Sequence, residues 1–327
     1  MRLYKKLKTI IILNISKKTL QKALLNSQGF LILLKIITLK FLKKIFDFFI
    51  YGNFFIALCA AAQAVQTLHI RHLSVDGNPH IVFIFTATFF LYNIHKPITF
   101  YLKKNILEHN PAVERTEARF IHAKEFEGPL SILTFTAGLV CLETFFRFYI
   151  SIKWLLFFVG LLSMAYVLPI FNGKRLRDVP YIKIFIIAGV WAFVTVIFPI
   201  KAFGQEWYSC DTFMVVEKMA FVLAITIPFD IRDMAFDAKT GVKTIPLSIG
   251  IQKSKWLSLI FLTLSFSITC MIYMMGVYLL NTLMAIGISI FISALVIYKI
   301  DDKRSDYFYY FLVDGLMLLQ SILVLLV

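Results

Sequence analysis

The sequence predicts an all-α fold, a polytopic membrane helical bundle, and three observations support this class. First, 59% of the 327 residues are hydrophobic and 16% are charged, against about 25% charged residues in soluble domains. Second, nine segments each supply the ~20 mostly apolar residues that a membrane-spanning helix needs. Third, Lys and Arg residues gather on alternate loops between these segments. Together these observations exclude a soluble globular enzyme, a disordered chain and a disulfide scaffold.

Each apolar segment is predicted to be a helix, because a helix satisfies its own backbone hydrogen bonds in lipid. None shows the ten-residue alternation of a membrane β-strand. The predicted spans cover about residues 45–66, 80–101, 129–149, 152–170, 182–200, 213–229, 256–275, 277–298 and 306–326.

Residues 1–44 form a separate predicted segment, because they carry eleven Lys or Arg residues and no acid. Two apolar patches interleave with these lysines and no small-residue cleavage site follows, so the segment is not a simple signal peptide. We interpret it as a basic amphipathic helix at the membrane surface. The alternative is a start codon placed upstream of the true domain. The expected division is therefore 1–44 and 45–327.

The distribution of charge predicts the orientation of the helices. With the N-terminus on one side, that side holds 27 Lys and Arg residues and the other side holds four. Lys96, Lys183 and Lys218 lie within spans, near their ends. The positive-inside rule therefore places the N-terminus and the even-numbered loops in the cytoplasm, with a bacterial-type inner or plasma membrane expected. This topology explains the net charge of +15 without nucleic acid as a partner.

Three acids at helical spacing follow the sixth predicted span. If this span continues as a helix, Asp233 and Asp237 are four residues apart and share a face, and Asp230 precedes Asp233 by three. Three carboxylates on one stripe repel each other, and a hard cation such as Mg²⁺ offsets the repulsion while also binding phosphate oxygens. Gly241 can end the helix, and Lys243 can return toward the same anion.

This stretch resembles the second aspartate-rich motif of the UbiA-type intramembrane aromatic prenyltransferases, roughly Asp-x-x-Asp-x-x-x-Asp-x-x-x-Gly-x-x-Thr-x-Pro. The matching positions are Asp230, Asp233, Asp237, Gly241, Thr244 and Pro246. The loop after the fourth span resembles the family's Tyr…Lys-Arg-x-x-x-x-Pro element through Tyr166, Lys174, Arg175 and Pro180. The resemblance covers about residues 45–326.

The resemblance implies a prenyl diphosphate held through Mg²⁺ in a cavity of the bundle, with its chain among apolar side chains. Loss of diphosphate would leave an allylic cation, which a lipophilic and often aromatic acceptor attacks. Membrane lipid is the expected surrounding, and no obligate protein partner is inferred. The implied catalytic and metal-binding residues are Asp230, Asp233 and Asp237, and the implied diphosphate-binding residues include Lys174, Arg175 and Lys243.

The sequence departs from the family at the first motif, Asn-Asp-x-x-Asp-x-x-x-Asp. If its Asn is aligned on Asn93, the three aspartate positions hold Ile94, Pro97 and Tyr101. His95 and Lys96 stand beside them, and we interpret both as groups that neutralise the diphosphate in place of one metal. Such a clamp stabilises the departing diphosphate. Lys96 is thus a catalytic candidate, and Asn93, His95 and Lys96 are diphosphate-binding candidates.

Three other interpretations stay open. The acids can belong to a solvated helix end that pairs with Arg232 and Lys239. The first half of the site can be lost, which leaves a catalytically inactive lipid-binding or scaffold membrane protein. A secondary transporter fits less well, because transporters place polar groups near the bilayer midplane and these acids cluster at one surface.

Overall fold

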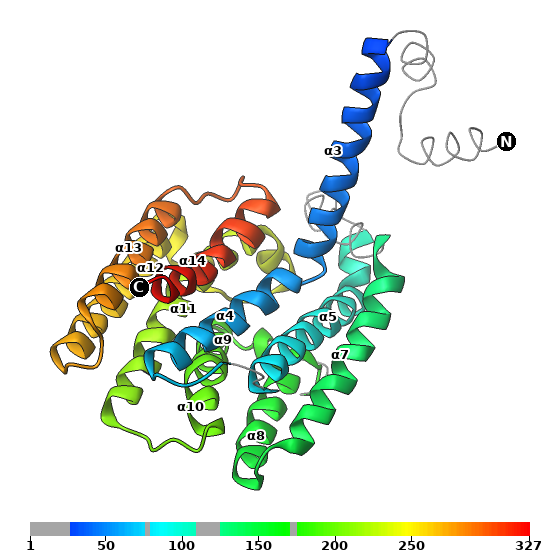
Figure 1. Ribbon diagram of the computed structural model, residues 1–327. Helices are drawn as coiled ribbons and strands as arrows, with labels where there is room; N and C mark the ends of the chain where they lie inside the picture. The colour runs from blue at the N-terminus through cyan, green and yellow to red at the C-terminus, as the bar shows by residue number, and fades with distance from the viewer. Residues whose placement is uncertain (1–26, 76–78, 109–124, 171–174) are drawn as a thin grey trace. The chain divides into compact units, whose positions relative to one another are not determined.

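A computed structural model describes most of the chain (Figure 1). The described backbone covers residues 27–75, 79–108, 125–170 and 175–327, and the described side chains cover 35–75, 79–95, 125–170 and 175–327. Every regular element in these ranges is a helix, which confirms the predicted all-α class. The chain divides into two units, one ending at Tyr51 and the other beginning at Gly52.

The first unit is represented by α3 (Ser27–Tyr51), a helix of 25 residues. Most of the predicted segment 1–44 lies outside the described residues, so its role and its boundary at residue 44 stay predictions. In the described part of α3, the apolar side chains of Leu39, Phe41 and Leu42 are exposed beside lysines. This mixture is compatible with a helix that touches a membrane surface.

The second unit opens at an interruption that the sequence did not lead us to expect. We expected one helix over 45–66, but α3 ends at Tyr51 and α4 (Phe54–Ile70) begins three residues later. Asn53 has a φ of 64°, in the left-handed region that Asn tolerates better than most residues. Its Nδ2 donates a 2.9 Å hydrogen bond to Oδ1 of Asn93. This hydrogen bond holds the interruption against the helix that contains Asn93.

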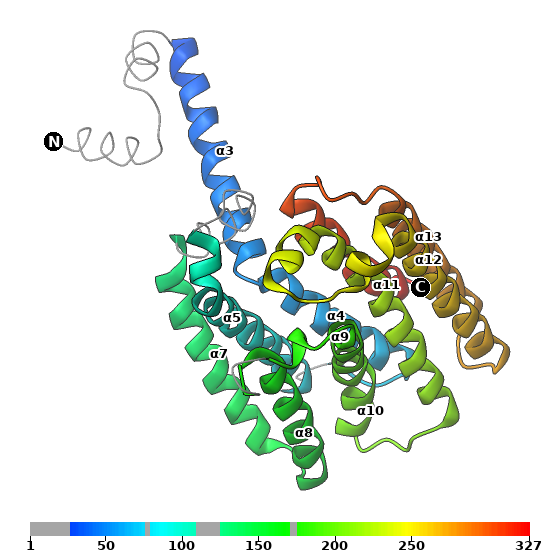
Figure 2. The same ribbon diagram turned by 180° about the vertical axis from the view of Figure 1, so that it is seen from behind.

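The remaining described elements of this unit are helices, seen from two sides in Figures 1 and 2. Two of them, η3 (Phe193–Ile197) and η4 (Phe308–Val313), are π-helical turns that continue directly into the helix that follows. In chain order they are α5 (Pro79–Glu108), α7 (Glu127–Arg147), α8 (Ile150–Val167), η2 (Leu176–Asp178), α9 (Ile182–Ala192), η3 (Phe193–Ile197), α10 (Phe198–Ala202), α11 (Ser209–Thr240), α12 (Ile245–Met274), α13 (Leu280–Tyr298), η4 (Phe308–Val313) and α14 (Asp314–Leu325).

Seven helices in the described ranges are long and apolar enough to cross a membrane, or eight if α3 and α4 together form one span. They match the seven predicted spans from 129–149 onward to within a few residues at most ends, although α11 and α12 extend further toward the turn between them. The expected number of nine is not confirmed, because α5, which contains the predicted span 80–101, is not among these helices.

Helix α11 lies at the centre of the second unit, where it packs against α12 on one side and α9 on the other. In its apolar stretch 67% of residues are buried, compared with 17% in α7 and 22% in α8. Helices α7 and α8 therefore present most of their apolar side chains outward, as lipid-facing helices do. Helix α4 packs against α5 and α14 and links the two sides of the unit.

A buried cluster of polar side chains joins α4, α11 and α14. The ammonium group of Lys218 donates to the side-chain oxygen of Gln63 and, over 2.9 Å, to that of Gln320. Gln63 in turn donates a 3.0 Å hydrogen bond to the hydroxyl of Ser321. Polar groups at this depth are costly unless they are hydrogen-bonded, so the cluster fixes how these three helices pack.

Replacing Lys218 with methionine is therefore expected to destabilise the bundle by about 1–3 kcal/mol. The buried oxygen of Gln63 loses its donor, and that of Gln320 keeps only a 3.4 Å hydrogen bond from Gln63. Thermal unfolding of the purified protein measures the change. Lys303→Met is the matched control, since Lys303 is exposed. Equal melting temperatures for the two variants would contradict a structural role for the cluster.

Candidate functional site

The three predicted acids lie on α11, which continues as a helix to Thr240 as expected. Asp230 and Asp237 are 2% and 4% exposed, and Asp233 lies between them in sequence with a partly exposed side chain. Gly241 ends the helix with a φ of 70°, a left-handed conformation typical of glycine at a helix C-terminus. The sequence-based placement of the acids on one helix face is thus compatible with the fold.

Two of the three carboxylates are paired with cations. The ammonium group of Lys183, at the start of α9, lies 2.5 Å from Oδ1 of Asp230. The guanidinium of Arg232 donates to both carboxylate oxygens of Asp233, over 2.9 and 3.0 Å. The pairing of an acid with Arg232, one of the alternatives open from sequence, therefore occurs. The same guanidinium lies about 5 Å from the centres of three aromatic rings, those of Phe229, Tyr309 and Tyr310.

The third carboxylate, that of Asp237, is different. Its Oδ2 is buried and accepts no hydrogen bond from any described residue. Lys183 and Arg177 lie within electrostatic range, and so do the other two aspartates. A buried acceptor without a donor is uncommon in a folded protein, and one explanation is a ligand or cation that completes the site.

Arg177 in η2 brings the remnant of the first motif toward these acids. Its guanidinium Nη1 donates to Nε2 of His95, and its Cζ lies 5.4 Å from the centre of the Tyr166 ring. Burial opposes the charge on Arg177, but Tyr166, Asp237, Asp178 and Asp233 favour it, so the pKa of the guanidinium rises above its ordinary value. Arg177 is therefore a partly buried, permanently charged group beside His95 of α5 and Tyr166 near the end of α8.

The predicted residues of the first motif have different surroundings. Nδ2 of Asn93 donates to the backbone oxygens of Gly52, over 3.0 Å, and Phe89, over 2.9 Å, so its side chain fixes the interruption before α4. His95 contacts Arg177. The side chain of Lys96 lies outside the described residues.

Three further diphosphate-binding candidates come from the loops. Lys174 lies outside the described residues. Arg175 is 1% exposed, and its guanidinium binds both carboxylate oxygens of Asp178, over 3.0 and 2.9 Å, which holds the turn η2. The side chain of Lys243 is exposed, and its backbone oxygen accepts a 3.2 Å hydrogen bond from the amide of Tyr181. Their binding roles stay predictions.

From sequence, Arg177 is either a diphosphate-binding residue or an ordinary positive-inside charge, and it is not among the selected site residues. Lys183 is not selected either, because it reads as a charge within the span 182–200. A lysine inside an apolar span is costly and usually has a partner, so Lys183 itself was a signal that an acid lies nearby. The position of Arg177 beside His95 depends on the packing of α5 against α8, which one sequence does not display.

The described residues include no group of three His, Cys, Asp or Glu side chains that could hold a metal ion. At the second motif, the unpaired oxygen of Asp237 fits a hard cation, with Asp233 one turn and Asp230 two turns earlier on the helix. At the first motif, residues 94, 97 and 101 supply no carboxylate, and His95 is engaged with Arg177. The two halves therefore differ: within the described residues the second keeps one buried carboxylate oxygen without a donor, whereas the first supplies no carboxylate.

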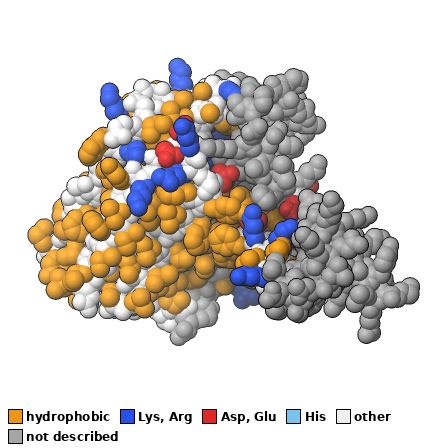
Figure 3. Space-filling view, turned by 90° about the horizontal axis from the view of Figure 1, so that it is seen from above, with side chains coloured by type: hydrophobic (Ala, Val, Ile, Leu, Met, Phe, Trp, Pro, Cys, Tyr) orange, Lys and Arg blue, Asp and Glu red, His pale blue; other side chains and the backbone are white. Residues whose placement is uncertain are grey.

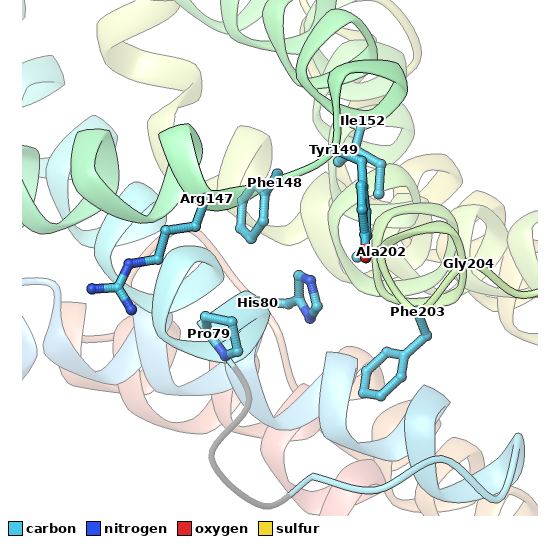
Figure 4. Close-up of a pocket in the computed structure, with 9 residues that line it drawn as sticks. All are labelled: Pro79, His80, Arg147, Phe148, Tyr149, Ile152, Ala202, Phe203 and Gly204. Carbon is cyan, nitrogen blue, oxygen red and sulfur yellow. The ribbon is translucent and has the colours of Figure 1, made fainter.

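In Figure 3, groups of charged side chains lie on part of the visible face, next to a broad area of hydrophobic side chains. A separate cavity of about 540 Å³ lies at the start of α5 and the ends of α7 and α10 (Figure 4). It contains His80, whose ring stacks on Phe148 with 5.0 Å between centroids. His95 lies fifteen residues further along α5, roughly 22 Å away at 1.5 Å per residue. This cavity is therefore not part of the candidate site.

Comparison with known proteins assigns the chain to a class. A model of the UbiA prenyltransferase family matches residues 108–317, more than half of the sequence, and the chain belongs to this family. Its apolar helices and this membership indicate an integral membrane protein. None of the curated proteins compared with the sequence matches it.

Solved structures share the fold. A UbiA homologue from Archaeoglobus fulgidus bound to GPP and Mg²⁺ has a TM-score of 0.59 at 12% identity, covering 86% of this chain and 100% of that one. The apo UbiA homologue from Aeropyrum pernix K1 has a TM-score of 0.55 at 13% identity, covering 82% and 94%. A structure of digeranylgeranylglyceryl phosphate synthase in membranes has a TM-score of 0.52 at 16% identity, covering 86% and 96%. At these identities the likeness shows the fold alone.

Proposed function

We propose that this chain is an integral membrane prenyltransferase, which moves an isoprenoid group from a prenyl diphosphate to a lipophilic acceptor, for which an aromatic ring is one candidate. The observation that carries the proposal is Arg177, which contacts His95 of the first motif and lies within electrostatic range of Asp233 and Asp237 of the second. Solved homologues bound to GPP or DMAPP with Mg²⁺ support a diphosphate as the anion.

In this mechanism the cations of the site hold the diphosphate. Arg177 and Lys183, with Lys96, Lys174 and Lys243 as predicted contributors, surround the anion with donors. The bond between the allylic carbon and the diphosphate oxygen breaks, and its electron pair leaves with the diphosphate. The acceptor then forms a bond to the allylic carbon and loses a proton. Fixed positive charges favour this step because negative charge develops on the leaving group.

Asp237, together with Asp233 and Asp230, would hold one Mg²⁺ at the second motif. When bound, the ion neutralises charge that develops on the leaving diphosphate. The protein's own contribution is to keep one carboxylate oxygen of Asp237 buried, with no donor among the described residues. Lys183 and Arg232 neutralise the two neighbouring aspartates and reduce repulsion within the stripe.

The proposal also sets the environment of the site. The positive-inside prediction places the charged end of the bundle at the cytoplasmic face of a plasma or bacterial inner membrane, where a water-soluble diphosphate group is accessible. The isoprenoid chain would lie among apolar side chains of the bundle. Residues 1–44 would rest on the same membrane face as a basic surface segment.

Diphosphate release by the purified protein tests the proposal. We expect release from at least one prenyl diphosphate in the presence of Mg²⁺, with a loss on the order of 10²-fold or more in Asp233→Ala and Lys96→Ala, because each removes a group beside the developing charge. Lys303→Met serves as the control, since Lys303 is exposed. Absence of release from donors of every chain length tested would overturn the assignment.

A second candidate function is a catalytically inactive lipid-binding or scaffold protein. The observation that favours it is the pairing of Asp230 and Asp233 with Lys183 and Arg232, combined with the missing acids of the first motif. This alternative predicts no release of diphosphate and no Mg²⁺-dependent binding of a prenyl diphosphate. The same experiment therefore separates the two.

A further inference from the structure

Arg177 contacts the stretch of α5 in which the first motif has lost its acids. The alignment of the family's first motif on Asn93 leaves residues 94, 97 and 101 without a carboxylate. Nη1 of Arg177 donates to His95, which stands within that motif. The ring of Tyr166 from α8 lies beneath the guanidinium, 5.4 Å from its Cζ. A fixed cation therefore contacts His95, within the stretch of α5 where the family's first motif would supply its carboxylates.

The charges around the three aspartates balance within the described part of the chain. Lys183 pairs with Asp230, Arg232 pairs with Asp233, and Arg177 and Lys183 both act on Asp237. Three cations thus face three carboxylates before any metal binds. A site with six aspartates has a large negative charge and needs divalent cations to accept a diphosphate. In this site the three cations offset the charge of the three carboxylates, so the excess negative charge is smaller.

Arginine at this position has the right chemistry for a phosphate group. Its planar guanidinium carries five N–H donors, and the contact with His95 uses one of them. Its charge does not depend on pH in the physiological range, and its fork binds phosphate oxygens in pairs. The contacts with Tyr166 and His95 hold the group in one orientation, which reduces the entropy lost on binding.

We infer that the guanidinium of Arg177 takes the place of the divalent cation that a complete first motif would hold, so that this site binds a diphosphate with one metal fewer. The inference rests on the proposed function for the identity of the ligand. It assigns to Arg177, with Lys183 behind it, the role of a built-in cation. The Mg²⁺ expected at Asp237 then strengthens binding but is not required for it.

Binding of inorganic diphosphate, measured by calorimetry on the purified full-length protein, tests the inference without relying on turnover. We expect wild type to bind in EDTA with an affinity no more than about 10-fold weaker than in Mg²⁺. Arg177→Gln should weaken the binding measured in EDTA by about 10- to 100-fold, the range for loss of a charged hydrogen-bonding group. Arg177→Lys should fall between the two, because it keeps the charge but loses the planar fork.

Arg304→Gln is the matched control, because Arg304 is about half exposed and pairs with Asp301 outside the site. Undetectable binding by wild type in EDTA would overturn the inference, and this measurement needs no variant to fold. Equal binding in EDTA by wild type and a folded Arg177→Gln would overturn it as well. Diphosphate release is assayed separately and tests the proposed function. If the protein releases diphosphate but binds it only in the presence of Mg²⁺, the inference is wrong and the proposed function stands.

Discussion

Replacing Asp237 with asparagine is expected to reduce diphosphate release on the order of 10²–10³-fold while leaving the melting temperature unchanged or higher. The buried Oδ2 of this carboxylate has no donor among the described residues, and two other aspartates lie within electrostatic range. An uncompensated buried acceptor costs stability, so its charge is not there for folding. Release assays and thermal unfolding of the same preparation measure both effects.

Asp302→Asn is the control for this substitution, because Asp302 is exposed and lies in another loop. It should change neither the rate nor the melting temperature. A marked fall in the melting temperature of Asp237→Asn would indicate instead that the carboxylate supports the fold. Full activity in a folded Asp237→Asn would remove Asp237 from the site.

Replacing Lys183 with methionine should cost about 3–5 kcal/mol of stability, the range for removing one partner of a buried ion pair. Asp230 is 2% exposed, and Lys183 is its ion-pair partner at 2.5 Å. Without the lysine, the carboxylate must stay buried with a poorly compensated charge or take up a proton. Unfolding of the purified variant, followed by thermal or denaturant titration, measures the loss.

The double variant Lys183→Met with Asp230→Asn tests the cause of that loss. If the buried charge is responsible, the double variant should recover most of the stability that the single variant lost, since both charges are gone. A double variant as unstable as Lys183→Met alone would show that the lysine acts through packing. Lys299→Met, at an exposed position, should resemble wild type in the same titration.

Much of this fold follows from the sequence because its signals are local. The length of an apolar run sets a span, and the spacing of Asp230, Asp233 and Asp237 places them on one helix as long as the helix continues. Gly241 ends α11 with a positive φ, as a glycine after a polar turn suggests. The helical continuation through the second motif and its end at Gly241 were therefore within reach of sequence reasoning.

The interruption before α4 was not within reach of sequence reasoning, because it depends on a tertiary contact. Gly52 and Asn53 lie in an apolar run that reads as continuous, and the hydrogen bond from Asn53 to Asn93 comes from a residue 40 positions away. The same applies to the ion pair between Lys183 and Asp230, which are 47 residues apart. Pairings of this kind depend on which helices become neighbours, and spacing along one sequence does not encode that directly.

The outward-facing character of α7 and α8 has a consequence for handling the protein. With 17% and 22% of their apolar stretches buried, these two helices leave most of their apolar side chains to the bilayer and depend on it for support. Tyr166, the ring beneath Arg177, lies near the end of α8. A short-chain detergent that strips annular lipid should therefore weaken the diphosphate site before it reduces helix content, and reconstitution into nanodiscs should restore it.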